Sequence, residues 1–124
     1  MNQIIRRTAL SNHSFDSLRY SLAQRNTYIA YIRGKRCSTE AAFFQEVSAA
    51  LQFPSYFGEN WAAFDECLCD LEWLHFDKLI IMVDDYSHMF SEWAPAKDLL
   101  MKYFMIAIEY WYTEGKRMDV ILNN

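Results

Sequence analysis

Glycine and proline are scarce in this sequence, with three and two occurrences among its 124 residues. Disordered chains are rich in such residues, whereas here 52% of the residues are hydrophobic, which is typical of a packed globule. The length is that of one domain, so we expect a single domain over residues 1–124. No apolar run approaches the ~18–20 residues that cross a bilayer, and the N-terminus lacks the apolar stretch of a signal peptide. We therefore expect a cytoplasmic protein without a membrane partner.

Cysteine is also rare, and the signatures of common enzymes are missing. Cys37, Cys67 and Cys69 are too few for a four-thiolate zinc site and have no histidine beside them, so we interpret them as reduced thiols. The sequence contains no glycine-rich phosphate loop, no G-x-S-x-G and no H-E-x-x-H. We expect no metal, no cofactor and no catalytic activity.

One pair of carboxylates keeps an enzymatic alternative open. Asp84 and Asp85 end an apolar run, and the ends of parallel strands often carry ligand or metal residues. Adjacent carboxylates bind Mg²⁺ when further ligands or a substrate phosphate accompany them, and the sequence signals neither. We favour a solvated strand end or a helix cap, with a small metal-dependent enzyme as the alternative.

Hydrophobic periodicity predicts an α/β fold. Apolar and β-branched runs predict strands at 27–34, 78–85 and 118–124. Apolar residues at helical spacing predict helices at 14–26, 40–53, 61–71 and 96–115. Ser14 is the expected cap of the first helix, and Pro54 is expected to end the second. Strands joined through helices imply a small parallel sheet with right-handed connections.

Charge is distributed unevenly along the chain. Residues 1–36 hold seven basic residues and one acid, whereas residues 37–124 hold five basic residues and fifteen acids. An acidic body repels nucleic acid, so we expect the aromatic residues of the second half to pack in the core rather than stack on bases. These residues are Trp73, Trp93, Tyr103, Phe104, Tyr110, Trp111 and Tyr112. Two interpretations of the basic segment stay open: a solvated face, or an intramolecular counterweight to the acids.

The predicted helix at 61–71 carries acids and no bases. Its expected core face is Trp61, Phe64, Leu68 and Leu71. The opposite face then presents Asp65, Glu66 and Asp70. Between residues 59 and 92 there are nine acids and one base. Such an uncompensated negative face makes physical sense if a positive surface normally covers it, so we expect a basic protein partner.

The stretch FPSYFGENWAAFDECL, residues 53–68, resembles the barstar family of intracellular ribonuclease inhibitors. The resemblance rests on a helix that ends before Pro54, a loop with Gly58 and Asn60, and an acid-Cys-Leu close. It covers residues 27–124 in the order of elements and leaves 1–26 as an N-terminal extension. It implies a small three-stranded parallel sheet flanked by helices, here with an extra N-terminal helical segment.

The resemblance also implies a mode of action, in which a helix and the loop before it plug the active site of a basic ribonuclease. Its acids stand in for the RNA phosphates. By position, the family's contacting tyrosine matches Tyr56 and its second principal acid matches Glu66. The first principal acid falls at Ala62, which has no charge, and a contacting aromatic falls at Asp65. A later acid on the last helix falls near Tyr110, with Glu109 beside it.

The acidic helix and the family resemblance together predict a partner-binding site. Its candidate residues are Tyr56, Phe57, Gly58, Glu59, Asn60, Ala62, Asp65, Glu66, Cys69 and Asp70. Tyr56 and Phe57 are candidate aromatic anchors, although Phe57 fits a core position equally well. We predict an immunity-type inhibitor of a basic ribonuclease or nuclease toxin. The alternative, suggested by Ala62, is a regulatory module that binds a non-nuclease partner through the same scaffold.

Overall fold

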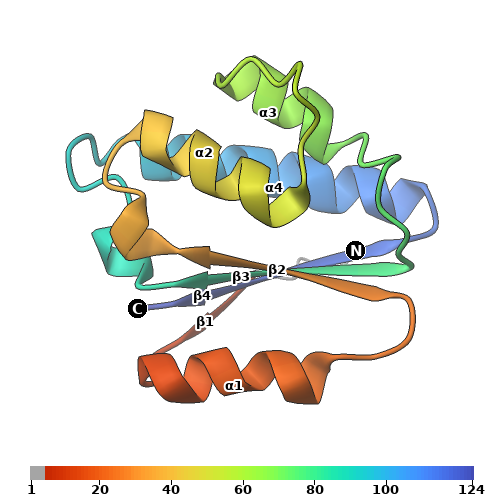
Figure 1. Ribbon diagram of the computed structural model, residues 1–124, viewed down its shortest axis with the longest axis horizontal. Coiled ribbons are helices and arrows are strands. Elements are labelled where there is room, and N and C mark those ends of the chain that lie inside the picture. The colour runs from red at the N-terminus through yellow and green to blue at the C-terminus, as the bar shows by residue number, and fades with distance from the viewer. Residues whose placement is uncertain (1–4) are drawn as a thin grey trace.

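The chain forms one parallel sheet with helices on both faces (Figure 1), as seen in a computed structural model that describes residues 5–124. The sheet has four strands in the order β1-β4-β3-β2. They are β1 (Ile5–Thr8), β2 (Thr27–Arg33), β3 (Lys78–Asp84) and β4 (Arg117–Asn123). The α/β class and the parallel pairing are confirmed, whereas the expectation of three strands is wrong by one.

Three α-helices lie on one face of the sheet and one lies on the other (Figure 1). The first face carries α2 (Glu40–Leu51), α3 (Trp61–Leu68) and α4 (Ala96–Thr113), and the second carries α1 (Asn12–Leu22). Short 3₁₀ turns, η1 (Gly34–Arg36) and η2 (Tyr86–His88), follow β2 and β3. β3 runs through the middle of the sheet and is buried from Leu79 to Asp84, which explains its almost continuous apolar sequence.

The N-terminal extension consists of a strand followed by a helix, rather than a helical segment alone. β1 pairs in parallel with β4, from Ile5 opposite Val120 to Thr8 opposite Asn123. α1 begins at Asn12 because the hydroxyl of Ser11, not Ser14, accepts a hydrogen bond from the Ser14 N–H. The helix buries Phe15 completely against the face of the sheet that the other helices leave open.

The helices around the candidate site end earlier than expected. Thr39 caps α2 by accepting from the Ala42 N–H, and Gln52 ends the helix in the left-handed conformation, two residues before Pro54. α3 ends at Leu68 rather than near residue 71, with Cys69 as its C-cap, and Leu71 beyond it has a left-handed backbone. Leu71 remains buried, so its predicted core position is confirmed although it lies outside the helix.

Aromatic side chains fill the space between the sheet and its three-helix face. Phe43, Phe64, Phe90 and Phe104 are fully buried or nearly so, and Trp111 is 6% exposed. The expectation that all the late aromatics belong to the core is wrong for three of them. Trp93 is 50% exposed, Tyr110 37% and Tyr112 63%.

One tight approach fixes the end of β2. A Cβ atom at Gly34 would stand 2.2 Å from the backbone oxygen of Asp85, so no larger residue fits between η1 and the end of β3. Over the described residues, no helix is both long enough and apolar enough to cross a membrane.

Candidate partner-binding site

The loop before α3 has a fixed path. The Phe57 N–H donates to the carbonyl of Pro54 at 3.0 Å, which closes a tight turn. The Phe57 ring packs against Phe53 with 4.8 Å between ring centroids. Asn60 then caps α3 by accepting from the Ala63 N–H at 2.8 Å, while its own amide donates to the Gly58 carbonyl. The direction in which α3 leaves the loop is therefore set by local bonds.

α3 is amphipathic, and its inner face is the one expected from the sequence. Phe64 and Leu68 are fully buried, and Cys67 is 4% exposed beside them. Trp61 is only half-buried and packs against the edge of the core. These contacts turn the acidic face away from the sheet, so that α3 forms the outermost part of the helical layer (Figure 1).

The structure places most of the predicted site residues on one exposed surface. Tyr56 is 71% exposed. Gly58, Glu59, Asn60, Ala62, Glu66 and Asp70 are also exposed, whereas Phe57, Asp65 and Cys69 are half-buried. Phe57 packs on Phe53 and Phe44, so it is chiefly a core residue that supports the loop. Tyr56 is left as the exposed aromatic candidate.

A hollow of about 340 Å³ is lined by residues of both the loop and the helix. It is lined by Tyr56, Phe57, Ala63, Glu66, Cys67 and Asp70. Desolvation raises the pKa of Tyr56, and the carboxylates of Asp70, Glu72 and Glu66 raise it further. The phenol thus stays a neutral hydrogen-bond donor beside these three carboxylates.

The acids of this surface are not neutralised from within the chain. The ion pairs found among residues 5–124 are Arg19–Asp16, Lys78–Asp119 and Arg117–Asp119. None of them involves residues 53–74. The basic segment therefore forms no ion pair with these acids among residues 5–124. α1 lies on the opposite face of the sheet from α3, and the bases on this segment other than Arg19 are solvent-exposed (Figure 1).

Cys69 is a poor candidate for ionic contact with a partner. Burial, followed by the nearby charge of Asp65 and a hydrogen bond to it, raises the pKa of this thiol to about 12. The Cys69 sulfur lies 3.9 Å from the Asp65 carboxylate. Cys69 is thus a neutral thiol that orients Asp65 at the edge of the site.

The last helix approaches the site through Tyr110. Desolvation raises the pKa of Tyr110, and Glu114, Cys69 and Asp70 add to the effect. The neighbouring Trp111 touches α3 directly, since its Nε1–H donates to the Leu68 carbonyl at 2.9 Å. Glu109 is exposed on the same helix. Its contribution to the site stays a prediction.

Three residues that hold α3 in place, Glu40, Trp61 and Trp111, were not predicted as part of the site. The Trp61 Nε1–H donates to the Glu40 carboxylate at 2.5 Å, which links the first turns of α3 and α2. The sequence carried no signal for this bond, because Glu40 reads as an ordinary acid in the first turn of a helix. Trp111 was expected in the core and is there, but its bond to Leu68 depends on how α4 packs.

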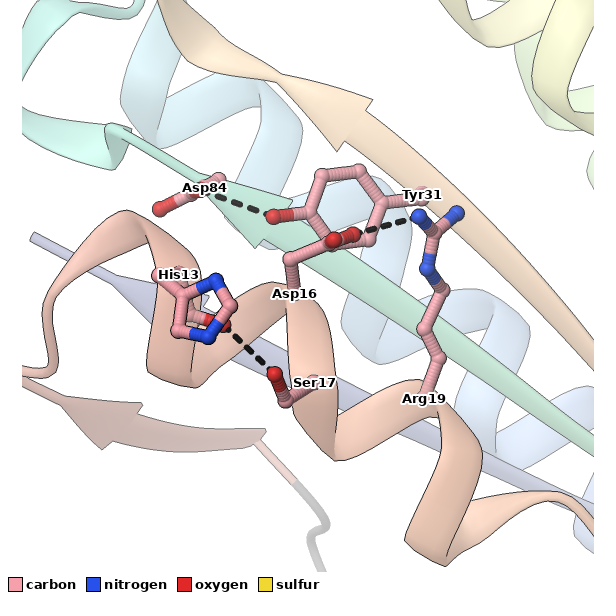
Figure 2. Close-up of polar contacts among 6 residues, drawn as sticks. All are labelled: His13, Asp16, Ser17, Arg19, Tyr31 and Asp84. Carbon is pink, nitrogen blue, oxygen red and sulfur yellow. Dashed lines mark hydrogen bonds and ion pairs between the residues drawn. The ribbon is translucent and has the colours of Figure 1, made fainter.

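Asp84 and Asp85, the alternative enzymatic pair, have structural partners instead. Asp84 is 4% exposed, so the expectation of a solvated strand end is wrong for it. Its carboxylate accepts from the Tyr31 hydroxyl at 2.7 Å and from the Asn123 amide at 2.9 Å. Figure 2 shows Tyr31 pointing at Asp84, with the Asp16–Arg19 pair of α1 over the same strands. The Asp85 side chain accepts from Asn12.

No group of three or more Cys, His, Asp or Glu side chains with the spacing of a metal site occurs in residues 5–124. Asp84 is instead a fastening point for the N-terminal extension. Asn123, which donates to Asp84, is fully buried and also bonds the side chain of Thr8 and the backbone of Leu10.

Comparison with known families agrees with this geometry. Residues 27–123 match the family described as Barstar (barnase inhibitor). A search of curated proteins returns no match. The match begins at the first residue of β2 and therefore leaves β1 and α1 outside it. Because it covers most of the chain and includes the loop and the acidic helix, the protein belongs to the barstar family, a family of ribonuclease inhibitors.

Proposed function

We propose that this protein inhibits a basic ribonuclease or nuclease toxin by inserting α3 and the preceding loop into its active site. The observation that carries the proposal is the acidic surface of residues 56–70. Exposed carboxylates surround an exposed tyrosine there, and no cation of residues 5–124 pairs with them. Family membership supports the same activity.

The mechanism follows from charge and shape. A ribonuclease cleft that binds RNA phosphates is positively charged, and a rigid negative surface is attracted to it over several ångströms. Glu66 and Asp70 border the hollow and take the place of phosphates, while Tyr56 covers the rim. Because the helix is backed by a packed core, it fills the cleft without having to fold on binding. Substrate is excluded by occupancy, and no catalytic step is required of the inhibitor.

The test is inhibition of barnase, used as a representative basic ribonuclease. We expect the unmodified protein to inhibit RNA cleavage in a one-to-one complex that weakens as salt is added. Glu66→Ala with Asp70→Ala should weaken the complex by about 30-fold or more, since desolvated charges at an interface centre act as hot spots.

The matched control removes two negative charges elsewhere. Asp77 and Asp98 are both exposed and lie outside the hollow, so Asp77→Ala with Asp98→Ala changes the net charge equally. Equal weakening by the two double variants would show that only overall charge matters and would overturn the assigned face.

A second candidate is a regulatory module that uses the same surface for a partner other than a nuclease. Ala62 favours it, because this exposed position carries no charge where the family's first principal acid falls. Full activity of barnase in the presence of excess protein, together with tight capture of a basic non-nuclease protein, would favour this candidate.

A further inference from the structure

The acidic helix is too short to hold its own shape. α3 has eight residues, whereas isolated helices below about 12–15 residues are marginal in water. Its acids also gain no support from bases on the same helix, since the sequence WAAFDECL contains none. Besides the Asn60 cap and the buried side chains of Phe64 and Leu68, tertiary contacts at the two ends of α3 must therefore help to set the direction of the acidic face.

At the N-terminal end, the helix is held by its own first residue. The Trp61 ring stacks with Phe43 of α2 and with Tyr103 of α4, with ring centroids 5.8 and 5.7 Å away and planes inclined by 23° and 9°. Phe44 and Phe64 meet the indole edge-on. These four contacts restrain the tilt of the indole ring.

The hydrogen bond to Glu40 restrains the ring within its own plane. Nε1 of Trp61 lies 2.5 Å from Oε2 of Glu40, and both side chains are partly buried. An N–H bond to an ionised carboxylate is about twice as strong as one between neutral groups. Stacking and the bond together restrain the first turn of α3.

At the C-terminal end, the indole of Trp111 restrains the helix through a hydrogen bond. The Trp111 Nε1–H donates to the Leu68 carbonyl, one of the last carbonyls of α3, in a buried bond of 2.9 Å. Helix ends leave such carbonyls without partners inside the helix. The chain then turns sharply at Leu71, whose φ is 46°.

We propose that Glu40, Trp61 and Trp111 are positioning residues that hold the acidic face of α3 in its binding orientation before any partner arrives. This inference rests on the proposed inhibitory function and adds residues outside the contact surface to it. A partner that meets a pre-oriented face loses little free energy to ordering it. A substitution that removes the contacts at either end of α3 should therefore weaken partner binding, although it changes no residue of the contact surface.

The first arm of the test needs no partner. We would follow amide hydrogen exchange in the unmodified protein, Glu40→Ala, Trp61→Phe and Trp111→Phe. We expect faster exchange in α3 and the loop before it, and unchanged protection in β2, β3 and β4. Glu40→Gln keeps an acceptor for the indole and should restore most of the protection. Unchanged exchange in α3, or uniform acceleration throughout the chain, would overturn the proposal.

The second arm measures binding to barnase. Glu40→Ala and Trp61→Phe should each weaken the complex by about tenfold, the effect expected for one charge-assisted bond. The two changes combined should weaken it little more than either alone, because they remove the same bond. Leu22→Ala is the control, since Leu22 packs on the other face of the sheet and its loss lowers stability far from α3.

The outcomes separate this inference from the proposed function. If the unmodified protein does not bind barnase, the proposed function fails, and hydrogen exchange alone decides whether the three residues position α3. If it binds, and the Glu40 and Trp61 variants bind as tightly as Leu22→Ala, the positioning role is overturned while the proposed function stands.

Discussion

The two faces of the sheet use carboxylates in opposite ways. On the face covered by α1, Asp84 is buried and accepts hydrogen bonds from Tyr31 and Asn123, and Asp16 pairs with Arg19. On the other face, Glu66 of α3 and Asp70 in the turn after it are exposed with no cation of residues 5–124 beside them. Acids satisfied within the chain stabilise the fold, whereas unsatisfied acids are better explained by a molecule outside it.

The largest effect on stability is expected from a substitution at Phe15, on the face of the sheet that α1 covers. This side chain is fully buried between α1 and the sheet, against Ile80 and Met82. Phe15→Ala should lower the free energy of unfolding by about 3–5 kcal/mol, because a cavity replaces the ring. Urea denaturation measures the loss, and barnase binding by the molecules that stay folded should not change. A parallel loss of affinity would mean that the two faces are coupled.

Asp84 offers the next largest effect. Asp84→Ala leaves the Tyr31 hydroxyl and one Asn123 N–H without their buried acceptor, which should cost about 2–4 kcal/mol of stability. The same denaturation assay applies, with Asp98→Ala as an exposed-acid control expected to change little. If Asp84→Ala were as stable as the control, Asp84 would not fasten the extension.

The buried, hydrogen-bonded carboxylate of Asp84 should also make stability depend on pH. Burial alone would raise the pKa of Asp84, but hydrogen bonds from Asn123 and Tyr31 lower it below its usual value of 3.8. The folded state therefore binds this proton less readily than the unfolded state. Its stabilising contribution is complete above about pH 4 and is lost as the pH falls through the folded-state pKa. Asp84→Asn should flatten this part of a stability profile measured from pH 6 to pH 2, and an unchanged profile would contradict the assignment.

The smallest predicted effect is a gain in stability rather than a loss. Glu66 on α3 and Asp70 in the turn after it line the same hollow and repel each other, so Glu66→Gln with Asp70→Asn should raise stability by about 0.3 kcal/mol at low salt. High salt should remove the gain because it screens the repulsion. Denaturation at two salt concentrations measures it. A clear loss of stability would show that these acids serve the fold after all.

The sequence predicted the parts of the fold that depend on local patterns. The apolar run of β3 and the long periodicity of α4 each appear where expected. β1 was missed because IRRT is only four residues long and carries no alternation of apolar and polar residues. Its pairing with β4 joins residues more than a hundred positions apart, which no local pattern reports.

The candidate site likewise combines features that the sequence predicted with features that only the structure revealed. Charge alone indicated the acidic surface, and residue spacing placed Phe64 and Leu68 inward and Glu66 outward, as observed. Spacing could not reveal that Phe57 supports the core, that Cys69 bonds Asp65, or that Glu40 accepts from Trp61. Each of those facts depends on side chains from separate segments meeting in space.

What the sequence determined by itself was the class of fold, the family and the sign of the charge on α3, because periodicity, motif and composition act along the chain. Only the tertiary structure decided that the basic extension covers the opposite face, that Asp84 is buried rather than solvated, and that two indoles hold the ends of α3. The physical reason is that burial and hydrogen-bond partnership belong to pairs of residues, and such pairs form only when the chain is folded.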